Sequence, residues 1–226
     1  MDKIKRISFS GLQLKLLGWI FTLCGAVGMA FFPGGTVGGV LKLVSYLAMP
    51  IFGFLLVEGF RCTGNLERYF MTMAVTALIS EPFYDYACNG VWLDFASMNG
   101  QNFLCALFLC QIELFFLNYL VGTKRGRIFQ SVALVLGCML WAFFLNIRCG
   151  IYMTLIVGLF YLLRDRVKAC YISVAAVSIP LYFTPELALL PISRYNEERG
   201  TYNKYLFYAL YPAMWAVLAG IKLLIK

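Results

Sequence analysis

Long apolar runs recur along this chain, and short segments between them carry most of the charged residues. A helix needs about 20 consecutive apolar residues to cross the hydrocarbon core of a bilayer. Lipid offers no partners to backbone N–H and C=O groups, so runs of this length are expected to be helical. The pattern predicts an all-α bundle of about eight spanning helices, near residues 12–32, 38–60, 66–88, 102–121, 128–146, 149–163, 168–190 and 204–225.

Composition supports the same class. The chain is 62% hydrophobic and 13% charged, whereas soluble domains average about 45–50% apolar and about 25% charged residues. We find no Ser/Pro-rich linker and no block of charge, which predicts a single transmembrane domain over residues 1–226. Pro180 and Pro185 fall inside the seventh predicted span, so that helix is expected to kink or to end early.

The distribution of basic residues predicts the orientation. If the N-terminus lies inside, 14 of the 19 Lys and Arg residues fall in inner segments. The excess matches the positive-inside rule, and an even number of spans then places both termini in the cytoplasm. The net charge of +8 is explained by topology, so the expected partner is the lipid bilayer and no nucleic acid. The basic residues predicted outside are Lys42, Arg148, Arg194, Arg199 and Lys204.

Glu58 ends the second predicted span and can snorkel to the basic inner loop beside Arg61. Three other carboxylates, Glu81, Asp85 and Glu113, fall in or beside predicted spans, where a charge costs about 2.5–3.5 kcal/mol at a helix centre. Glu81 and Asp85 are four residues apart and therefore share one helical face. Such a pair can carry acid–base chemistry or hold a cation, or it can form structural ion pairs with arginines at the same level. Glu113 lies in the middle of the fourth span and needs a buried partner or a polar cavity. These three residues are the candidate catalytic groups.

The last predicted outer loop concentrates polar residues. Arginines near a glycine are suited to binding phosphate or carboxylate groups, although a solvated loop between helices has the same composition. No Cys spacing typical of metal sites occurs, and no metal is expected. The candidate substrate-binding residues of this loop are Arg194, Tyr195, Asn196, Glu198, Arg199 and Lys204.

Five segments together resemble the TraX family of membrane proteins. They are LKLLGWIFTL (Leu14–Leu23), MPIFGFLLVEGF (Met49–Phe60), ALISEPFYD (Ala77–Asp85), QNFLCALFL (Gln101–Leu109) and RYNEERGTYNKYLFYALYP (Arg194–Pro212). The resemblance covers nearly the whole chain. It implies a relative of membrane acyltransferases in the bacterial inner membrane, with acetyl-CoA as donor and a peptide or envelope component as acceptor.

The chain departs from the family pattern at the positions that carry polar residues in other members. Gly25 and Ala26 stand where the family usually has Asp-His, and Ser45 and Tyr46 stand where it has Gly-Arg. Ala213–Met214 replaces a Leu-His pair, and the chain contains no histidine. An imidazole is the usual general base near neutral pH, so its loss bears directly on catalysis.

Three functions therefore stay open from the sequence. The first is an acyltransferase in which Glu81 or Asp85 replaces histidine as the base. The second is a catalytically inactive membrane scaffold or partner-binding protein that keeps the family's fold. The third is a transporter with Glu113 on its path.

Overall fold

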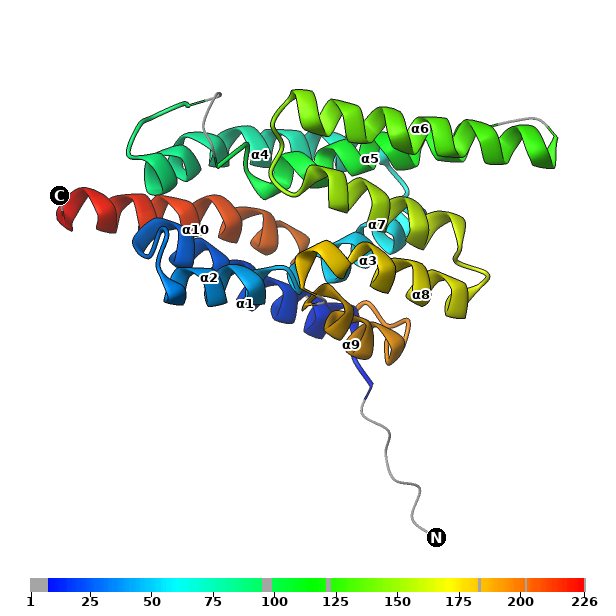
Figure 1. Ribbon diagram of the computed structural model, residues 1–226, viewed down its shortest axis with the longest axis horizontal. Coiled ribbons are helices and arrows are strands. Elements are labelled where there is room, and N and C mark those ends of the chain that lie inside the picture. Colours follow the sequence, from blue (N-terminus) through cyan, green and yellow to red (C-terminus); the bar gives the residue numbers. More distant parts are fainter. Residues whose placement is uncertain (1–7, 95–98, 121–122, 183, 202, 226) are drawn as a thin grey trace, which may run out of the picture.

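The computed structural model describes residues 8–94, 99–120, 123–182, 184–201 and 203–225. Within these ranges the chain is helical, which confirms the predicted all-α class, and isolated β-bridges join Phe9 to Tyr195 and Gln101 to Ile147. The helices, drawn in Figure 1, are α1 (Gly11–Phe31), α2 (Thr36–Ser45), α3 (Ala48–Cys62), α4 (Leu66–Asn89), α5 (Phe103–Tyr119), α6 (Lys124–Phe144), α7 (Gly150–Leu162), α8 (Val167–Val177), α9 (Leu189–Ser193) and α10 (Lys204–Ile225).

Several helices are long and apolar enough to cross a membrane. In the described residues these are the stretches Gly11–Phe31, Thr36–Cys62, Arg125–Phe144 and Tyr205–Ile225. Helices α5, α7 and α8 are apolar but shorter. Large apolar side chains such as Phe144 are exposed on the bundle surface, as lipid contact requires. The structure is therefore that of a helical membrane protein.

The second predicted span is broken into α2 and α3 at Tyr46 and Leu47. The cause is Pro50, because a proline ring clashes with the carbonyl four residues before it and cannot donate a hydrogen bond. That carbonyl belongs to Tyr46, and it accepts from the Met49 N–H instead, at 3.2 Å. The break leaves a kinked element whose two parts both contact α1.

The seventh predicted span does not continue as one helix. α8 ends at Val177, and short 3₁₀ turns over Ile179–Leu181 and Thr184–Ala188 lead into α9. Each turn contains one of the two prolines, so the expected interruption is confirmed and the continuous helix over 168–190 is wrong. After α9 the chain lies beside the start of α1, where the Phe9 N–H donates to the Arg194 carbonyl at 2.9 Å.

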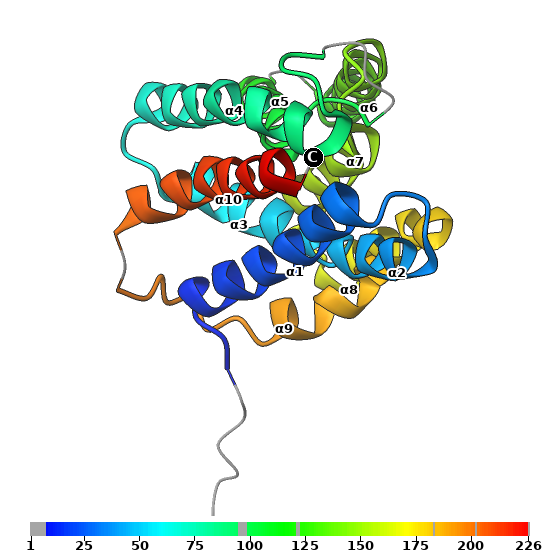
Figure 2. The same cartoon turned by 90° about the vertical axis from the view of Figure 1, so that its left-hand side faces the viewer.

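The return of the chain through α8 and α9 bears on the predicted positions of the two termini. α10 begins at the same end of the bundle as α1 and runs alongside α4, and the Lys222 ammonium donates to the Ala87 carbonyl at 2.7 Å. The start of α1 and the end of α10 consequently lie at opposite ends of the bundle (Figures 1 and 2). The predicted number of spans and the cytoplasmic location of both termini are therefore not confirmed, because the chain between α8 and α9 turns back where hydropathy predicts a full crossing.

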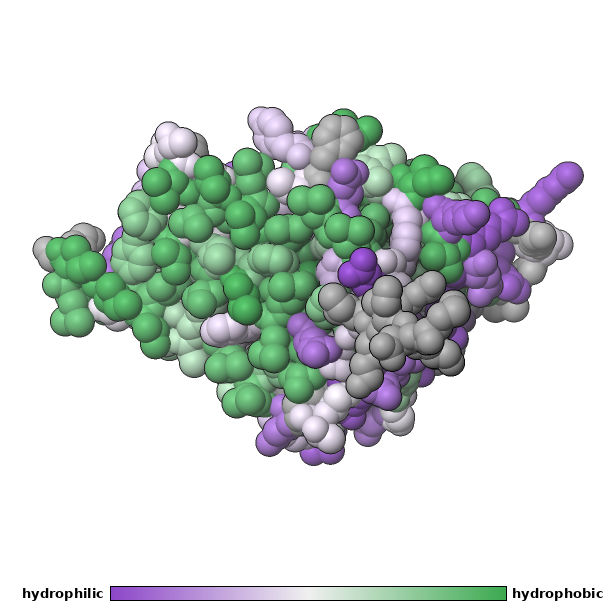
Figure 3. All heavy atoms as spheres, turned by 90° about the horizontal axis from the view of Figure 1, so that it is seen from below, coloured by the Kyte–Doolittle hydropathy of each residue, from purple (hydrophilic) through white to green (hydrophobic). Residues whose placement is uncertain are grey.

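Basic side chains gather at the end where α1 begins, which we call the basic end. Figure 3 shows apolar surface toward the left and hydrophilic side chains toward the right, where the basic end lies. The opposite end, called the far end, holds Lys42, Arg148 and Lys222 among the described cations. The basic end holds Arg61, Arg68, Arg125, Arg127, Arg164, Arg166, Lys168, Arg194 and Arg199.

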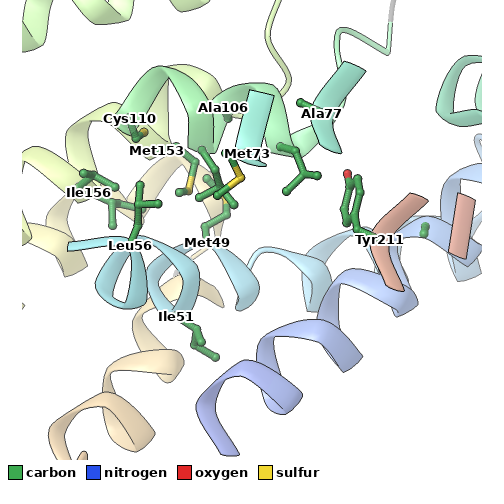
Figure 4. Packing of buried hydrophobic residues seen from close by; sticks show 14 of the residues in the cluster. Met49, Ile51, Leu56, Met73, Ala77, Ala106, Cys110, Met153, Ile156 and Tyr211 are labelled. Atoms are coloured by element: carbon green, nitrogen blue, oxygen red, sulfur yellow. The ribbon is translucent and has the colours of Figure 1, made fainter. Parts of the chain in front are cut away.

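Helix α3 lies in the centre of the packed core and contacts α1, α5 and α7. Met49, Ile51 and Leu56 of α3 are buried, as are Met153 and Ile156 of α7 (Figure 4). Without a side chain at Gly53 the two helices approach closely, as small residues permit in membrane bundles. The candidate sites lie at the two ends of this core.

Candidate functional site

The carboxylate of Glu81 connects α4 to the start of α5 through hydrogen bonds. It is buried and accepts from the Asn102 backbone N–H at 3.3 Å and from the Asn102 side-chain amide. Asn102 is itself the N-cap of α5, because its side-chain oxygen accepts from the Leu104 N–H at 2.8 Å. Its amide also donates to the Ala77 carbonyl at 2.9 Å. These contacts favour the structural interpretation of Glu81.

Asp85 lies one turn further along α4 and also accepts a hydrogen bond from a backbone N–H group. Its Oδ2 accepts from the Asp94 N–H at 2.7 Å, while its Oδ1 is buried without a hydrogen-bond partner among the described residues. The neighbouring Tyr84 hydroxyl donates to the Asn99 carbonyl at 3.0 Å. The predicted shared face of Glu81 and Asp85 therefore anchors the chain that follows α4. The alternative of ion pairs with arginine does not hold in the described residues, where Arg164–Glu58 is the one ion pair.

Glu113 is enclosed in the centre of the bundle. Its relative exposure is 0%, and neither carboxylate oxygen has a hydrogen-bond partner among the described residues. It faces α7, since a side-chain carbon at Gly158 would lie 2.8 Å from its Oε1. Glu113 lines neither of the two recesses described below. The expected polar cavity around it is thus not among these recesses, and they provide no path for a transporter through Glu113.

The loop of Arg194–Gly200 lies at the basic end against the start of α1. The Asn196 N–H donates to the Phe9 carbonyl at 3.0 Å, and the Gly11 N–H donates to the Glu198 carbonyl at 2.8 Å. Asn196 also donates through its side chain to Glu198 at 3.0 Å. The side chain of Lys204 lies outside the described residues.

The structure does not assemble the predicted composite site. Glu81 and Asp85 lie at the far end, and Arg194, Tyr195, Asn196, Glu198 and Arg199 lie at the basic end. The separation arises because the chain returns through α8 and α9. The loop Arg194–Gly200 therefore lies at the basic end, whereas the hydropathy pattern predicts it at the other end of the bundle.

A recess of about 650 Å³, part of it open to the surroundings, lies at the basic end; we call it the basic-end recess. Arg164 and Glu58 form an ion pair across it, with Nη2 and Oε1 separated by 3.2 Å. Of the predicted site residues only Tyr195 lines it; Glu58, Arg164 and Glu197 were not predicted. The single charge in the apolar segment FLLVEGF was the available signal for Glu58. The lining is Phe54, Val57, Glu58, Phe160, Arg164, Val167, Cys170, Tyr171, Tyr195 and Glu197.

Aromatic rings form much of the wall of the basic-end recess. Phe54 packs edge to face against Tyr195 with ring centroids 5.3 Å apart, and against Phe160 at 5.8 Å. Glu197 follows on a backbone with φ of 63°, a conformation uncommon for residues other than glycine. The site thus combines apolar faces with two carboxylates and one guanidinium.

A second recess, the Arg148 pocket, encloses about 450 Å³, part of it open to the surroundings, in the half of the bundle toward the far end. The pocket is lined by Thr22, Gly25, Ala26, Met29, Ser45, Tyr46, Ala48, Met49, Tyr84, Phe103, Arg148, Cys149, Tyr211 and Trp215.

The Arg148 pocket gathers positions that the family resemblance led us to expect as polar. Gly25, Ala26, Ser45 and Tyr46 all line it. Gly25 and Ser45 are in direct apposition, because a side-chain carbon at Gly25 would collide with the Ser45 Cβ. The pocket lining contains no carboxylate and no imidazole, so it offers no conventional general base.

Comparison with known proteins assigns the sequence to a family. The TraX protein family matches residues 10–222. A curated relative from Dichelobacter nodosus, named "Probable fimbrial assembly protein FimC, serogroup H1", is 25% identical over 249 residues, covering 98% of this chain and 99% of the relative. No solved structure matches the chain. Since the match extends from the start of α1 to the last turns of α10, the chain belongs to the TraX family.

Proposed function

We propose that this protein is a membrane acyltransferase that modifies an amine of a peptide or envelope component at the basic-end recess. The observation that carries the proposal is the charge and shape of that recess. Its lining holds Glu58, Glu197 and Arg164, a net charge of −1, among aromatic side chains. The relative from Dichelobacter nodosus is named a probable fimbrial assembly protein, and this name supports a fibre subunit or another surface protein as the acceptor.

The recess suits a cationic acceptor. Aromatic faces attract an ammonium group through their negative quadrupole, and a carboxylate adds direct charge attraction. Glu58 is already paired with Arg164, and Glu197 forms no ion pair among the described residues. Glu197 is therefore the group with which an incoming ammonium would pair.

The residues present support a balanced reaction. The bound ammonium first releases one proton to water; the neutral amine then attacks the thioester carbonyl, a C–N bond forms, the C–S bond breaks and the acyl group moves to nitrogen. The amine proton passes to the Glu58 carboxylate and from there to the leaving thiolate. Arg164 stands close enough to Glu58 to stabilise the oxyanion that forms at the carbonyl.

The donor and the orientation follow from the charge distribution. Acetyl-CoA, which family resemblance implies, is a polyanion, and Arg166, Lys168, Arg194 and Arg199 would attract it to the basic end. The positive-inside rule places this end in the cytoplasm, where the donor is present. A bacterial inner-membrane location completes the proposal.

The test is acetyl transfer from labelled acetyl-CoA to a peptide with a free N-terminus, catalysed by the purified full chain in lipid nanodiscs. We expect Glu197→Gln to raise the KM for the peptide at least about tenfold, since it removes a charged partner, and Glu58→Gln to lower kcat. Glu67→Gln is the matched control, because Glu67 is an exposed acid at the start of α4 outside the recess. Absence of transfer by the folded wild type, or equal loss in all three variants, contradicts the proposal.

A non-catalytic scaffold is the second candidate. It is favoured by the tying of Glu81 and Asp85 to backbone groups and by the lack of a base in the Arg148 pocket. Complementation of a deletion strain separates the two functions. A Glu58→Gln/Glu197→Gln double variant that restores surface assembly to the wild-type level supports the scaffold.

A further inference from the structure

We propose that the Arg148 pocket binds an amphiphile that has a carboxylate or phosphate head and an apolar chain. The site lies apart from the basic-end recess, so this inference does not rest on the proposed acyl transfer. It rests on the guanidinium of Arg148, on the apolar side chains that line the pocket, and on the absence of an ion pair between Arg148 and the buried acids Glu81 and Asp85 among the described residues.

The groups that lie near the guanidinium of Arg148 are neutral. Arg148 lies in the turn between α6 and α7, and the Tyr84 hydroxyl and the Cys149 thiol are close to it. Among the described residues no carboxylate lies within 4.0 Å of it, since the one ion pair found there is Arg164–Glu58. Arginine cannot lose its proton in a protein, so the charge persists at any working pH.

The buried acids of α4 form no ion pair with Arg148 among the described residues. Glu81 accepts from Asn102, and Asp85 accepts from the Asp94 backbone. The Arg148 side chain is partly buried, and a charge that is partly removed from water is costly unless it is paired. An anionic ligand that enters the Arg148 pocket would supply the missing counter-charge.

The walls of the pocket define the rest of the ligand. Met29, Met49, Phe103 and Trp215 provide apolar surface, with little polar competition. The Tyr46 hydroxyl belongs to the same lining as Arg148, whereas the Tyr84 and Ser45 hydroxyls already donate to the Asn99 and Lys42 carbonyls. A guanidinium binds carboxylate or phosphate through two parallel hydrogen bonds, and one hydroxyl donor can add a third.

Backbone geometry explains why the space exists. The break between α2 and α3, imposed by Pro50, places Ser45 and Tyr46 opposite α1. The α1 positions that face them, Gly25 and Ala26, have almost no side-chain volume. Larger residues at these positions would fill the pocket, so the small side chains leave space for a ligand.

The experiment measures binding to the purified full chain in detergent by quenching of tryptophan fluorescence. The probes are a dibrominated fatty acid, a dibrominated alkyl phosphate, the matching dibrominated alcohol, and inorganic phosphate as a competitor. We expect both brominated anions to bind and to quench. We expect the alcohol to bind at least about tenfold more weakly, because it lacks the charge that pairs with Arg148. The two anions compared with each other show which head the pocket prefers.

Two kinds of variant localise the site. Arg148→Gln should lose at least about tenfold in affinity for both anions, and Arg148→Lys should recover part of it. Arg127→Gln is the control, because it removes an exposed cation of α6 at the basic end. Trp215→Phe should remove most of the quenching in a protein that keeps its guanidinium, so the assay stays informative if Arg148→Gln does not fold.

Each alternative result overturns a defined part of the proposal. Equal binding of the alcohol and the anions shows that charge is not recognised. Competition by inorganic phosphate at the same concentration as the alkyl phosphate shows a small-anion site without an apolar subsite. Quenching that is unchanged in Trp215→Phe places the ligand elsewhere.

Discussion

Asn102 joins three structural roles in one side chain, and replacing it by alanine tests how the far end is held together. Its oxygen caps α5 by accepting from the Leu104 N–H at 2.8 Å. Its amide donates to the buried Glu81 carboxylate and to the Ala77 carbonyl. Asn102→Ala removes all of these contacts, while the Asn102 backbone N–H still donates to Glu81.

The expected cost follows from those contacts. Loss of an N-cap costs about 1 kcal/mol. Removal of the amide leaves Glu81, which is 4% exposed, with one fewer donor, and depriving a buried polar group of a partner costs about 1–3 kcal/mol. We therefore expect Asn102→Ala to lower the free energy of unfolding by about 2–4 kcal/mol.

Asn65→Ala provides the matched comparison. Asn65 caps α4 by accepting from the Arg68 N–H at 2.8 Å, but it is exposed and bonds no buried carboxylate in the described structure. Its loss should cost only about 1 kcal/mol. The measurement is unfolding in mixed micelles of dodecyl maltoside with increasing SDS, followed by tryptophan fluorescence. Equal destabilisation by the two variants would refute the view that Asn102 and Glu81 form a structural tie.

Three further predictions concern the centre and the basic end, and the same unfolding measurement checks each of them. Glu113→Leu should raise the free energy of unfolding by about 1–3 kcal/mol, because it removes a buried polar group without a partner; a loss would indicate an interaction that the described contacts lack. Gly53→Leu should lower it by about 1–3 kcal/mol through overpacking, since even a Cβ would lie 3.2 Å from Ile156. Adding Ile156→Ala should recover part of that loss, and no recovery would contradict contact at this point. Arg164→Gln should change stability by less than about 1 kcal/mol, because its ion pair with Glu58 is partly exposed; a larger change would mean that the pair carries structural weight.

The all-α class and most helix positions could be predicted because they depend on local hydropathy. The turn within residues 167–193 could not, although Pro180 and Pro185 indicated an interruption. A proline shows that a helix stops, but the direction of the chain afterwards depends on contacts with distant residues, here between Phe9 and Arg194. A hydropathy window contains no information of that kind.

The candidate sites were predictable only in part for a similar reason. The shared face of Glu81 and Asp85 follows from helical spacing, but their partners are backbone groups of Asn102 and Asp94. Such partners leave no mark in the sequence. The Arg148 pocket likewise draws its lining from α1, α2, α3, α4, α5, α10 and the turn before α7, which only the folded chain brings together.

The positions of the loops relative to the membrane test the account most directly. Single cysteines placed at Gly34, Gly64 and Arg199 in a cysteine-free background can be labelled in intact cells with a reagent that does not cross the inner membrane. Gly64 and Arg199 belong to the basic end, and Gly34 follows α1 at the far end. If the basic end faces the cytoplasm, as we propose from the positive-inside rule, Gly34→Cys is labelled, while Gly64→Cys and Arg199→Cys are labelled only after the membrane is permeabilised. Labelling of Arg199→Cys together with Gly34→Cys in intact cells would contradict the return of the chain through α8 and α9.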